Sequence, residues 1–365
     1  PRSHQRRPRS GGGPCQLTPH RARKRNLRMG TSKLTLMCLA VPMLLMWNRS
    51  ACQEQPQGLA AAWWNVENLF DTRDDTLTLD DGFTPQGDHH WTPRRLNAKL
   101  QAIAKTIVMM DCPDVVGLAE VENAYVLRRL CMGTPLRMAG YGFIHHDSPD
   151  RRGIDCALLY RKGRFRPIAD STVSLSDSAA GILTRDILVV VGLTAEADTV
   201  CLLLNHWPSK LGGEAADRLR MQTAQRLRTL MAELHRRHPA AAVVALGDMN
   251  STPDEPAVAT GMGFGTDSLN AEGILNLTAR LPRDWGSHKY QGEWAYLDQA
   301  YLLAPATWRC TAMELIRLAH LLTDEQRLPG VKPRRTYLGP HYAGGVSDHL
   351  PLLMRLECRK AHLSD

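Results

Sequence analysis

The chain has 365 residues, 43% hydrophobic and 22% charged, which is enough to bury a core and excludes a low-complexity or disordered polymer. Its net charge of +8 comes from one end: residues 1–28 hold nine of the 45 Lys and Arg and no acid, leaving 36 basic against 37 acidic side chains in residues 29–365. The composition therefore gives no support for strong non-specific affinity for DNA through net charge.

Residues 1–28 are rich in Arg, Pro and Gly and could not bury a core, so we interpret them as a disordered basic extension upstream of the true start at Met29. Residues 29–52 have the pattern of a signal peptide or lipoprotein signal: Lys33, an apolar run over 34–47, and small residues before Cys52. The run is too short for a comfortable transmembrane helix, so we expect no stable membrane span in the mature protein.

The sequence is compatible with two ways of processing this signal. Cleavage near Ala51 would give a periplasmic or secreted protein, whereas lipidation of Cys52 would give a cell-surface lipoprotein, although Arg49 is unfavourable for a lipobox. A buried N-terminal helix is the remaining alternative. We therefore expect an exported protein with a possible lipid anchor at Cys52.

The next 300 residues, about 59–358, contain no linker or repeat and predict one domain, with residues 359–365 as a tail. The six cysteines in this part show neither CxxC nor metal-ligand spacing. Cys156 and Cys201 lie in apolar runs and are predicted to be buried thiols. A Cys112–Cys131 disulfide after export stays open.

Strand-like apolar runs recur along the chain, at 61–66, 115–119, 141–146, 154–160, 186–194, 199–205, 242–247, 295–303 and 350–356. Two segments show helical periodicity instead. Residues 94–110 follow Thr92 as N-cap and Pro93 in the first turn, and residues 214–238 carry one apolar stripe opposite Arg and Glu. Paired strands between helices predict two packed sheets flanked by helices.

Several of these runs stop at, or begin from, a polar residue of a catalytic type. These residues are Asn65, Glu120, Asn205 and His206, Asp248 and Asn250, Asp298, and Asp348 and His349. One such case is ordinary turn chemistry, but the whole set predicts a site assembled at one edge of a sheet sandwich.

Carboxylates and amides are hard oxygen ligands that suit Mg²⁺ or Mn²⁺. Such an ion together with histidines and carboxylates indicates hydrolysis of a phosphate ester, in which a His–Asp pair activates water. HExxH, GxxxxGK[ST] and GxSxG are all absent from the sequence.

The ordered set "WNVENL", "LAEVEN", "RGIDCALLYR", "NHWPS", "GDMN", "LDQAYL" and "SDHLP" resembles the endonuclease/exonuclease/phosphatase superfamily, in particular an exported bacterial subgroup. The resemblance covers residues 60–357. It implies an α/β (α+β) fold: a four-layered, deoxyribonuclease I-like sandwich of two packed mixed β-sheets flanked by helices.

The resemblance also implies residue roles. Glu120 would be the principal metal ligand, with Asn65 and Asp348 near the metal. His349 would be the general base, polarised by Asp298.

The same resemblance implies further contacts to the reacting phosphate. Asp248 would orient the attacking water and Asn250 would hold a phosphate oxygen. His206 would contact the scissile phosphate or assist the leaving group, with Asp155 as its carboxylate partner; Asp155 as a simple strand cap stays open.

Two further acidic residues lie near this set in the sequence. Glu67 is either an acid near the metal or an exposed turn residue. Glu122 is interpreted as structural, because a single residue separates it from Glu120.

Substrate contacts are predicted from position alone. Asn205 and the loop or strand-start residues Arg152, Arg185 and Tyr290 are the candidate substrate-binding residues. Tyr337 and Tyr342, in the loop before His349, are further stacking candidates.

We expect a monomeric, metal-dependent phosphodiesterase, most simply a nuclease acting on DNA or RNA. The alternatives are a lipid or small-molecule phosphoesterase, such as a sphingomyelinase or inositol phosphatase, and an inactive surface-binding module.

Overall fold

The computed structural model describes residues 58–176, 183–326 and 328–359. The predictions for the basic extension, the signal segment, Cys52 and residues 360–365 lie outside these ranges. Within them, no helix is both long enough and apolar enough to cross a membrane.

The first sheet is mixed and has six strands. In spatial order they are β13 (Trp308–Leu315), β18 (Leu352–Cys358), β1 (Leu59–Leu69), β2 (Val115–Val121), β4 (Asp155–Arg161) and β3 (Tyr141–His145). Only β1 and β2 pair in parallel, with Asn65 beside Ala119. The carboxyl ends of these two strands therefore reach the same edge, as the sequence predicted for Asn65 and Glu120.

The second sheet has the same design. Its order is β5 (Phe165–Val173), β6 (Ile187–Thr194), β7 (Thr199–His206), β8 (Ala242–Asp248), β12 (Asp298–Leu303) and β9 (Leu275–Asn276). Here β7 and β8 form the parallel pair. The predicted strands agree with the observed ones to within three residues at each end.

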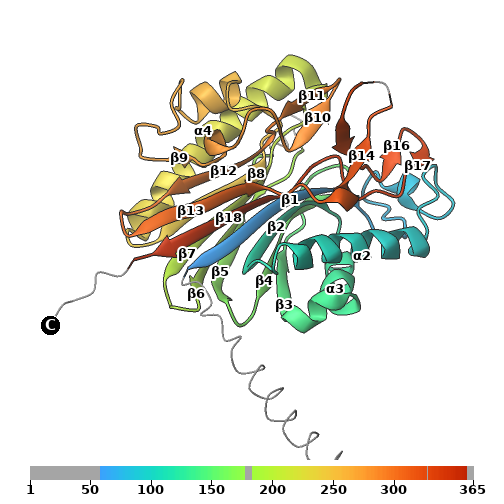
Figure 1. Ribbon diagram of the computed structural model, residues 1–365, viewed down its shortest axis with the longest axis horizontal. Coiled ribbons are helices and arrows are strands. Elements are labelled where there is room, and N and C mark those ends of the chain that lie inside the picture. The colour runs from blue at the N-terminus through green and yellow to red at the C-terminus, as the bar shows by residue number, and fades with distance from the viewer. Residues whose placement is uncertain (1–57, 177–182, 327, 360–365) are drawn as a thin grey trace, which may run out of the picture. The chain divides into compact units, whose positions relative to one another are not determined.

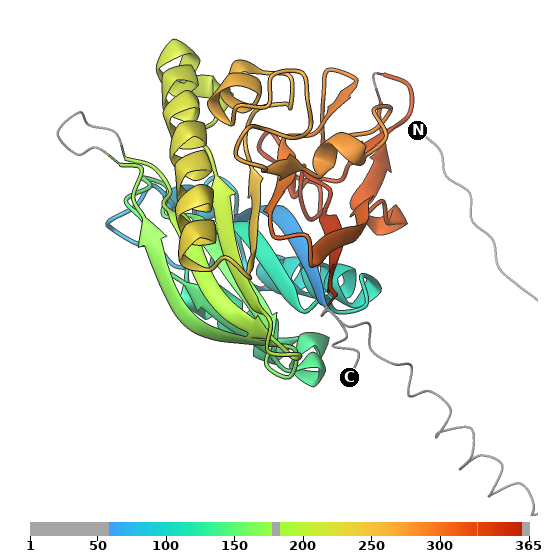
Figure 2. The ribbon, with the colours of Figure 1, turned by 90° about the vertical axis from the view of Figure 1, so that its left-hand side faces the viewer.

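Helices cover the outer face of each sheet, as Figures 1 and 2 show. The helices α2 (Pro93–Met109) and α3 (Ala124–Gly133) pack on the first sheet, and α4 (Gly213–Arg237) packs on the second. A separate apolar core, with Trp63 at its centre, fills the space between the sheets. The predicted four-layered sandwich is therefore confirmed.

The first predicted helix begins where its cap indicates, and the second begins within one residue of its predicted start although Gly212, at its N-cap, makes no side-chain cap hydrogen bond. The Thr92 side chain accepts a hydrogen bond from the Arg95 backbone N–H, Pro93 occupies the first turn, and the stripe from Leu96 to Ile107 is buried. The α4 stripe packs in the same way against the second sheet. Both helices thus follow from 3.6-residue periodicity, with a capping side chain in α2.

The sequence reading missed α3, the edge strands β5 and β13, and three short ribbons. These ribbons are β10 (His288–Tyr290) with β11 (Glu293–Ala295), β14 (Leu322–Asp324) with β15 (Val331–Pro333), and β16 (Tyr337–Leu338) with β17 (His341–Tyr342). A signal for α3 was present: Asn123 is its N-cap and accepts from the N–H groups of Tyr125 and Val126.

Cys112 and Cys131 are both free thiols, so the Cys112–Cys131 disulfide is not formed in this structure. Cys156 and Cys201 are buried, as predicted.

Candidate active site

The predicted catalytic side chains, with the exception of Asp155, meet at one end of the space between the two sheets. His206 and Asp298 are the direct neighbours of Asp248 across β7, β8 and β12. Because side chains alternate along a strand, all three lie on the face that packs on the first sheet. The register of the second sheet alone therefore brings together three of the predicted residues.

His349 and Asp298 form a buried pair. The His349 Nδ1 atom lies 2.5 Å from Asp298 Oδ2. Trp63 donates its indole N–H to Asp298 Oδ1 at 2.7 Å, and Trp64 donates to the His349 carbonyl at 2.9 Å. Consecutive tryptophans of β1 thus hold the two members of the pair, one from each side of the strand.

The other edge of His349 faces Asp248. Its Nε2 atom is 3.7 Å from Asp248 Oδ2, and His206 Nε2 is also 3.7 Å from that oxygen. The Asn65 amide donates to the same Asp248 oxygen at 3.0 Å and to Glu120 Oε1 at 3.2 Å. A single phosphate-sized group placed here would be within reach of both imidazoles.

The backbone is bent around this point. Glu67, Asn68, Glu120 and Asn250 have positive φ angles of 49°, 54°, 63° and 46°. Such conformations are uncommon for residues other than glycine, and they gather at functional sites. At Glu120 the bend coincides with a register shift in β2, and the carboxylate accepts from the Asn68 N–H at 2.7 Å.

Charge and burial set the pKa values of the central groups. Burial alone would lower the pKa of His349, but Asp298, Asp248 and Asp348 together raise it well above its ordinary value. Burial raises the pKa of Asp248 to about 6 despite nearby His349. Burial, assisted by Arg185 and Arg152, lowers the pKa of His206 far enough to keep that imidazole neutral at pH 7.

A second ionic group borders the site and was not predicted. Arg335 pairs with Glu67 Oε1 at 2.8 Å and with Asp348 Oδ2 at 3.0 Å. Glu67 also accepts from the Thr336 N–H at 2.9 Å, and buried Lys99 donates to the Glu67 carbonyl and to Thr336 Oγ1.

This ionic group settles part of the question about Glu67. The residue is only 5% exposed, so the exposed-turn alternative is wrong. Its partner Arg335 stands 268 positions away in the chain, and no local sequence pattern links the two. Glu122 is also buried and accepts from the Asp71 N–H, as a structural residue would.

Two predicted site residues point the wrong way. Asn205 is fully buried and faces α4, opposite to His206; its amide donates to the Leu203 carbonyl and accepts from Trp207. Asn205 therefore cannot contact substrate. Asp155 lies on the outer face of the first sheet, bonded to Ser148 and 3.8 Å from His145, so it is not the partner of His206.

The predicted substrate-binding side chains differ in access. Arg185 is buried and bridges Asp150 Oδ2 and the Trp207 carbonyl, both at 2.8 Å, so it braces the chain behind His206. The Arg152 side chain is 42% exposed and close enough to affect the pKa of His206. Tyr290 is 69% exposed on β10, a strand bridged to His349 through His288.

Two groups of side chains at this site have the spacing to hold a metal ion: Asp248, Asp298 and His349, and His288, Asp348 and His349. Asp348 belongs to the second group, as predicted. Glu120 and Asn65 lie beside the first, joined to Asp248 through the Asn65 amide. The oxygen-rich donor set fits a hard divalent cation.

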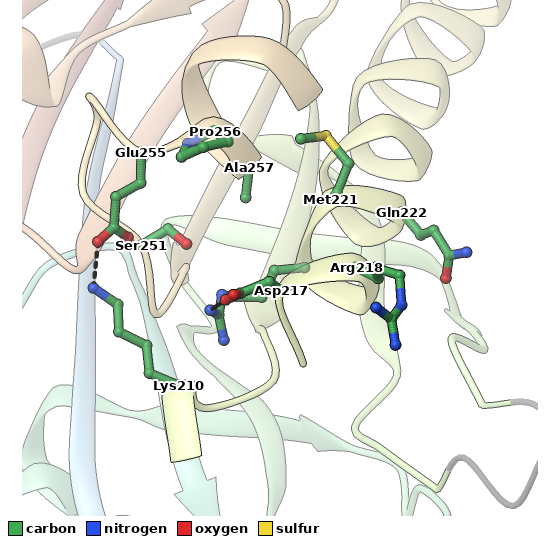
Figure 3. Close-up of a pocket in the computed structure, with 10 residues that line it drawn as sticks. Lys210, Asp217, Arg218, Met221, Gln222, Ser251, Glu255, Pro256 and Ala257 are labelled. Carbon is green, nitrogen blue, oxygen red and sulfur yellow. Dashed lines mark hydrogen bonds and ion pairs between the residues drawn. The ribbon is translucent and has the colours of Figure 1, made fainter. Parts of the chain in front are cut away.

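A cavity of about 650 Å³ lies between α4 and the chain that follows Asn250 (Figure 3). Its lining contains none of the predicted catalytic side chains, and its cations are matched by acids. Lys210 pairs with Glu255 at 2.6 Å, and Arg220 pairs with Asp217. The cavity thus belongs to the supporting structure behind the site.

Comparison with solved structures gives the same fold. The chain is 17% identical to D. rerio TDP2 complexed with a single-strand DNA product, covering 82% of this chain and 98% of that one with a TM-score of 0.52. The human Nocturnin catalytic domain gives 14% identity, 83% and 94% coverage and a TM-score of 0.53. A Bacteroides thetaiotaomicron mannosyl-6-phosphatase is 15% identical, with 82% of this chain and 99% of that chain covered and a TM-score of 0.52.

A search of curated proteins finds no match. The decisive comparison is with families: the model of the Endonuclease/Exonuclease/phosphatase family matches residues 60–358, which is most of the chain. The protein is therefore a member of the endonuclease/exonuclease/phosphatase family of phosphoester hydrolases.

Proposed function

We propose that this protein is a divalent-metal-dependent phosphodiesterase, most simply a nuclease, with His349 as the general base. One observation carries the proposal: the buried Asp298–His349 pair directs Nε2 toward Asp248, at the point where Asn65 and His206 also arrive.

The chemistry assigned to His349 follows from its hydrogen bonds. With Asp298 accepting from Nδ1–H, the neutral form of the imidazole presents the lone pair of Nε2, which can take a proton from a water molecule. Asp248, 3.7 Å away, is placed to hold that water. Asp298 then stabilises the imidazolium that forms when the proton is transferred.

His206 has the complementary role. Its Nδ1 atom is buried and has no hydrogen-bond partner, so the proton of this neutral ring belongs on Nε2. An Nε2–H group facing Asp248 and Glu120 can donate to a phosphate oxygen. Asn250, whose amide donates to the Trp207 carbonyl, supports the chain on the same side.

We assign the metal to Glu120, Asn65 and Asp348, with Mg²⁺ or Mn²⁺ as the ion. When bound, it would neutralise phosphate oxygens and the carboxylate of Asp348, one of the three that raise the His349 pKa, and so favour the neutral imidazole. Arg335 already neutralises one oxygen of Asp348 from the outer side.

Substrate choice is the finer part of the proposal. The TDP2 complex contains DNA, which supports a nuclease, whereas another structural neighbour is a mannosyl-6-phosphatase. A cavity at the end of the β3–β4 hairpin, lined by Asp75, Glu122, Asp147, Asp150 and Asp155, would repel a long polyanion that extended across this surface. That cavity favours a small phosphoester as the second candidate.

One experiment separates these functions. The full chain is assayed with plasmid DNA, RNA, sphingomyelin, bis-p-nitrophenyl phosphate and mannose 6-phosphate, each with Mg²⁺, Mn²⁺ or EDTA. Metal-dependent DNA nicking supports the nuclease, and diester cleavage without nicking supports the second candidate. Activity that survives EDTA would refute the metal-dependent mechanism.

We also propose export through residues 29–52, as the pattern of Lys33 and the apolar run suggests. The test is fractionation with mass spectrometry of the N-terminus. A processed chain outside the cytoplasm supports the proposal, diacylation of Cys52 identifies the lipoprotein route, and an unprocessed cytoplasmic chain contradicts it.

A further inference from the structure

Three side chains with metal-ligating atoms gather at the end of the β3–β4 hairpin, away from the catalytic residues. They are His145, Asp147 and Asp155, and their ligand atoms all lie within 4.8 Å of one another. His145 and Asp155 share the outer face of the first sheet with Phe143 and Ala157. The catalytic groups lie on the inner face, so this cluster is a separate site.

The imidazole of His145 has a buried nitrogen for which the described residues supply no partner. The His145 side chain is only 4% exposed, and its Nε2 atom is buried with no hydrogen-bond partner. The nearest acids are Asp155 Oδ2, 3.8 Å from Nε2, and Asp147 Oδ1, 3.7 Å from Nδ1. Both separations exceed a hydrogen bond. A buried polar atom in this state needs a partner from outside the chain.

The two carboxylates of the cluster also favour a bound cation. β3 ends at His145, which pairs with Ala157 of β4, and beyond this pair a carboxylate oxygen of Asp147 and one of Asp155 lie within 4.8 Å of each other. Two like charges this close repel each other. Ser148 donates a hydrogen bond to Asp155, but no Lys or Arg is recorded as an ion-pair partner of Asp147 or Asp155 among the described residues. A bound cation would remove both the repulsion and the orphaned nitrogen.

Access is provided by a cavity of about 600 Å³. Asp147, Ser148 and Asp155 line it, together with Glu122 and Asp75. The Asp147 side chain is 89% exposed, so it is free to close over an ion that enters. Waters in the cavity would fill the remaining coordination positions.

We propose that His145, Asp147 and Asp155 form a second divalent-cation site, independent of the catalytic centre. One imidazole with two carboxylates suits Mn²⁺ or Zn²⁺ better than Mg²⁺ or Ca²⁺, which prefer oxygen ligands alone. The ion would fasten the loop that follows β3, which carries Asp150 and Arg152, to the start of β4. Since Asp150 holds Arg185 behind His206, that loop supports the active site.

The test is to count bound Mn²⁺ by the electron paramagnetic resonance signal of the free ion during titration of the metal-depleted full chain. The wild type should bind two ions per chain, and His145→Ala and Asp155→Asn should each bind one. Glu120→Gln, at the catalytic centre, should also bind one, and the double variant Glu120→Gln/His145→Ala none. Added Zn²⁺ should displace the ion that remains in Glu120→Gln.

The matched control is His146→Ala. His146 is the next residue, is partly exposed and pairs with Asp170 instead of the cluster, so this variant should still bind two ions. Circular dichroism and melting of the metal-free variants verify their folding, and the near-isosteric Asp155→Asn keeps the test valid if His145→Ala unfolds.

Two results would overturn the second site. One is a single bound Mn²⁺ in wild type that is lost in Glu120→Gln and kept in His145→Ala and Asp155→Asn. The other is two ions bound to both cluster variants. A catalytic centre that binds no Mn²⁺ would give a different result. Wild type and Glu120→Gln would then each bind one ion, and the cluster variants would bind none.

Discussion

At the scale of single residues, the orientation of His349 depends on hydrogen bonds that single substitutions can remove one at a time. Its Nδ1–H is directed to Asp298, and that carboxylate is in turn fixed by the Trp63 indole. The proposed proton acceptor is therefore oriented by a chain of three side chains, each buried and each from a different strand or strand end.

We expect His349→Ala to lower kcat by at least about 100-fold, because the general base is lost. Asp298→Asn should have a similar effect, since an amide can donate to Nδ1 and leave the proton on Nε2. Steady-state assays with bis-p-nitrophenyl phosphate measure both. His238→Ala, at the end of α4, is the control, and unchanged turnover in His349→Ala would contradict the assignment.

We propose Arg335, which the sequence did not reveal, as a positioning residue. Arg335→Ala should lower kcat/KM by about 10- to 100-fold, because Glu67 and Asp348 lose their shared cation. Arg335→Lys should recover only part of this loss, since one ammonium cannot bridge both carboxylates as the guanidinium does. If Arg335 acted through overall stability alone, the loss of activity would follow the melting temperature across the two variants.

His288 makes stability depend on pH. Burial, together with nearby His349, lowers the pKa of His288 to about 4, whereas the unfolded value is 6.5. The unfolded chain therefore binds the extra proton first, so this contribution to stability is complete above pH 6.5 and is lost as the pH falls toward 4.

The test compares wild type with His288→Asn by urea unfolding in EDTA. The difference in unfolding free energy should fall by about 2 kcal/mol between pH 7 and pH 4.5. Parallel pH profiles for the two proteins would contradict the burial of a neutral His288.

At the scale of elements, the Thr92 cap is the clearest local signal in the sequence for the start of a helix. Thr92→Ala should lower the free energy of unfolding by about 1 kcal/mol, because the Arg95 N–H loses its acceptor. Thr229→Ala, in the exposed middle of α4, serves as control and should cost less. Equal losses in chemical denaturation would argue against the cap.

The strands show why the sequence predicted the position of some candidate site residues correctly and placed others on the wrong face of a sheet. In β7 nearly every residue from Val200 to Asn205 is apolar, since both faces are covered, so no alternation in the sequence tells Asn205 from His206. Asp155 failed for the same reason: its strand is buried on both faces. Asp248, Asp298 and His349 were placed correctly because a strand end and its register decide their position.

At the scale of the whole molecule, the sequence predicted the layers but not the contacts between distant loops. The four-layered sandwich followed from the apolar runs, two helical stripes and the family resemblance. The Glu67–Arg335 pair depends on how a distant loop folds back onto the first sheet, and the His145 cluster depends on the path of the loop between β3 and β4. No periodicity in the sequence encodes either.

The packing of the whole domain also makes the thiols unequal. Burial raises the pKa of Cys131 to about 12 and of Cys201 to about 11. In native protein at pH 8, iodoacetamide should therefore modify neither residue, and both should react after unfolding. Peptide mass spectrometry measures this, with partly exposed Cys112 as the internal comparison; rapid native labelling of Cys131 would show that the α3 core opens readily.

The consecutive tryptophans of β1 give the site an optical reporter of its own. Trp63 is hydrogen-bonded to the carboxylate that pairs with His349, and Trp64 to the backbone of His349 itself. Any cation, phosphate or proton that changes the charge of that pair also changes the surroundings of an indole N–H. Occupancy of the catalytic centre should therefore be visible in intrinsic fluorescence, without an added dye, and Trp63→Phe should dim that signal.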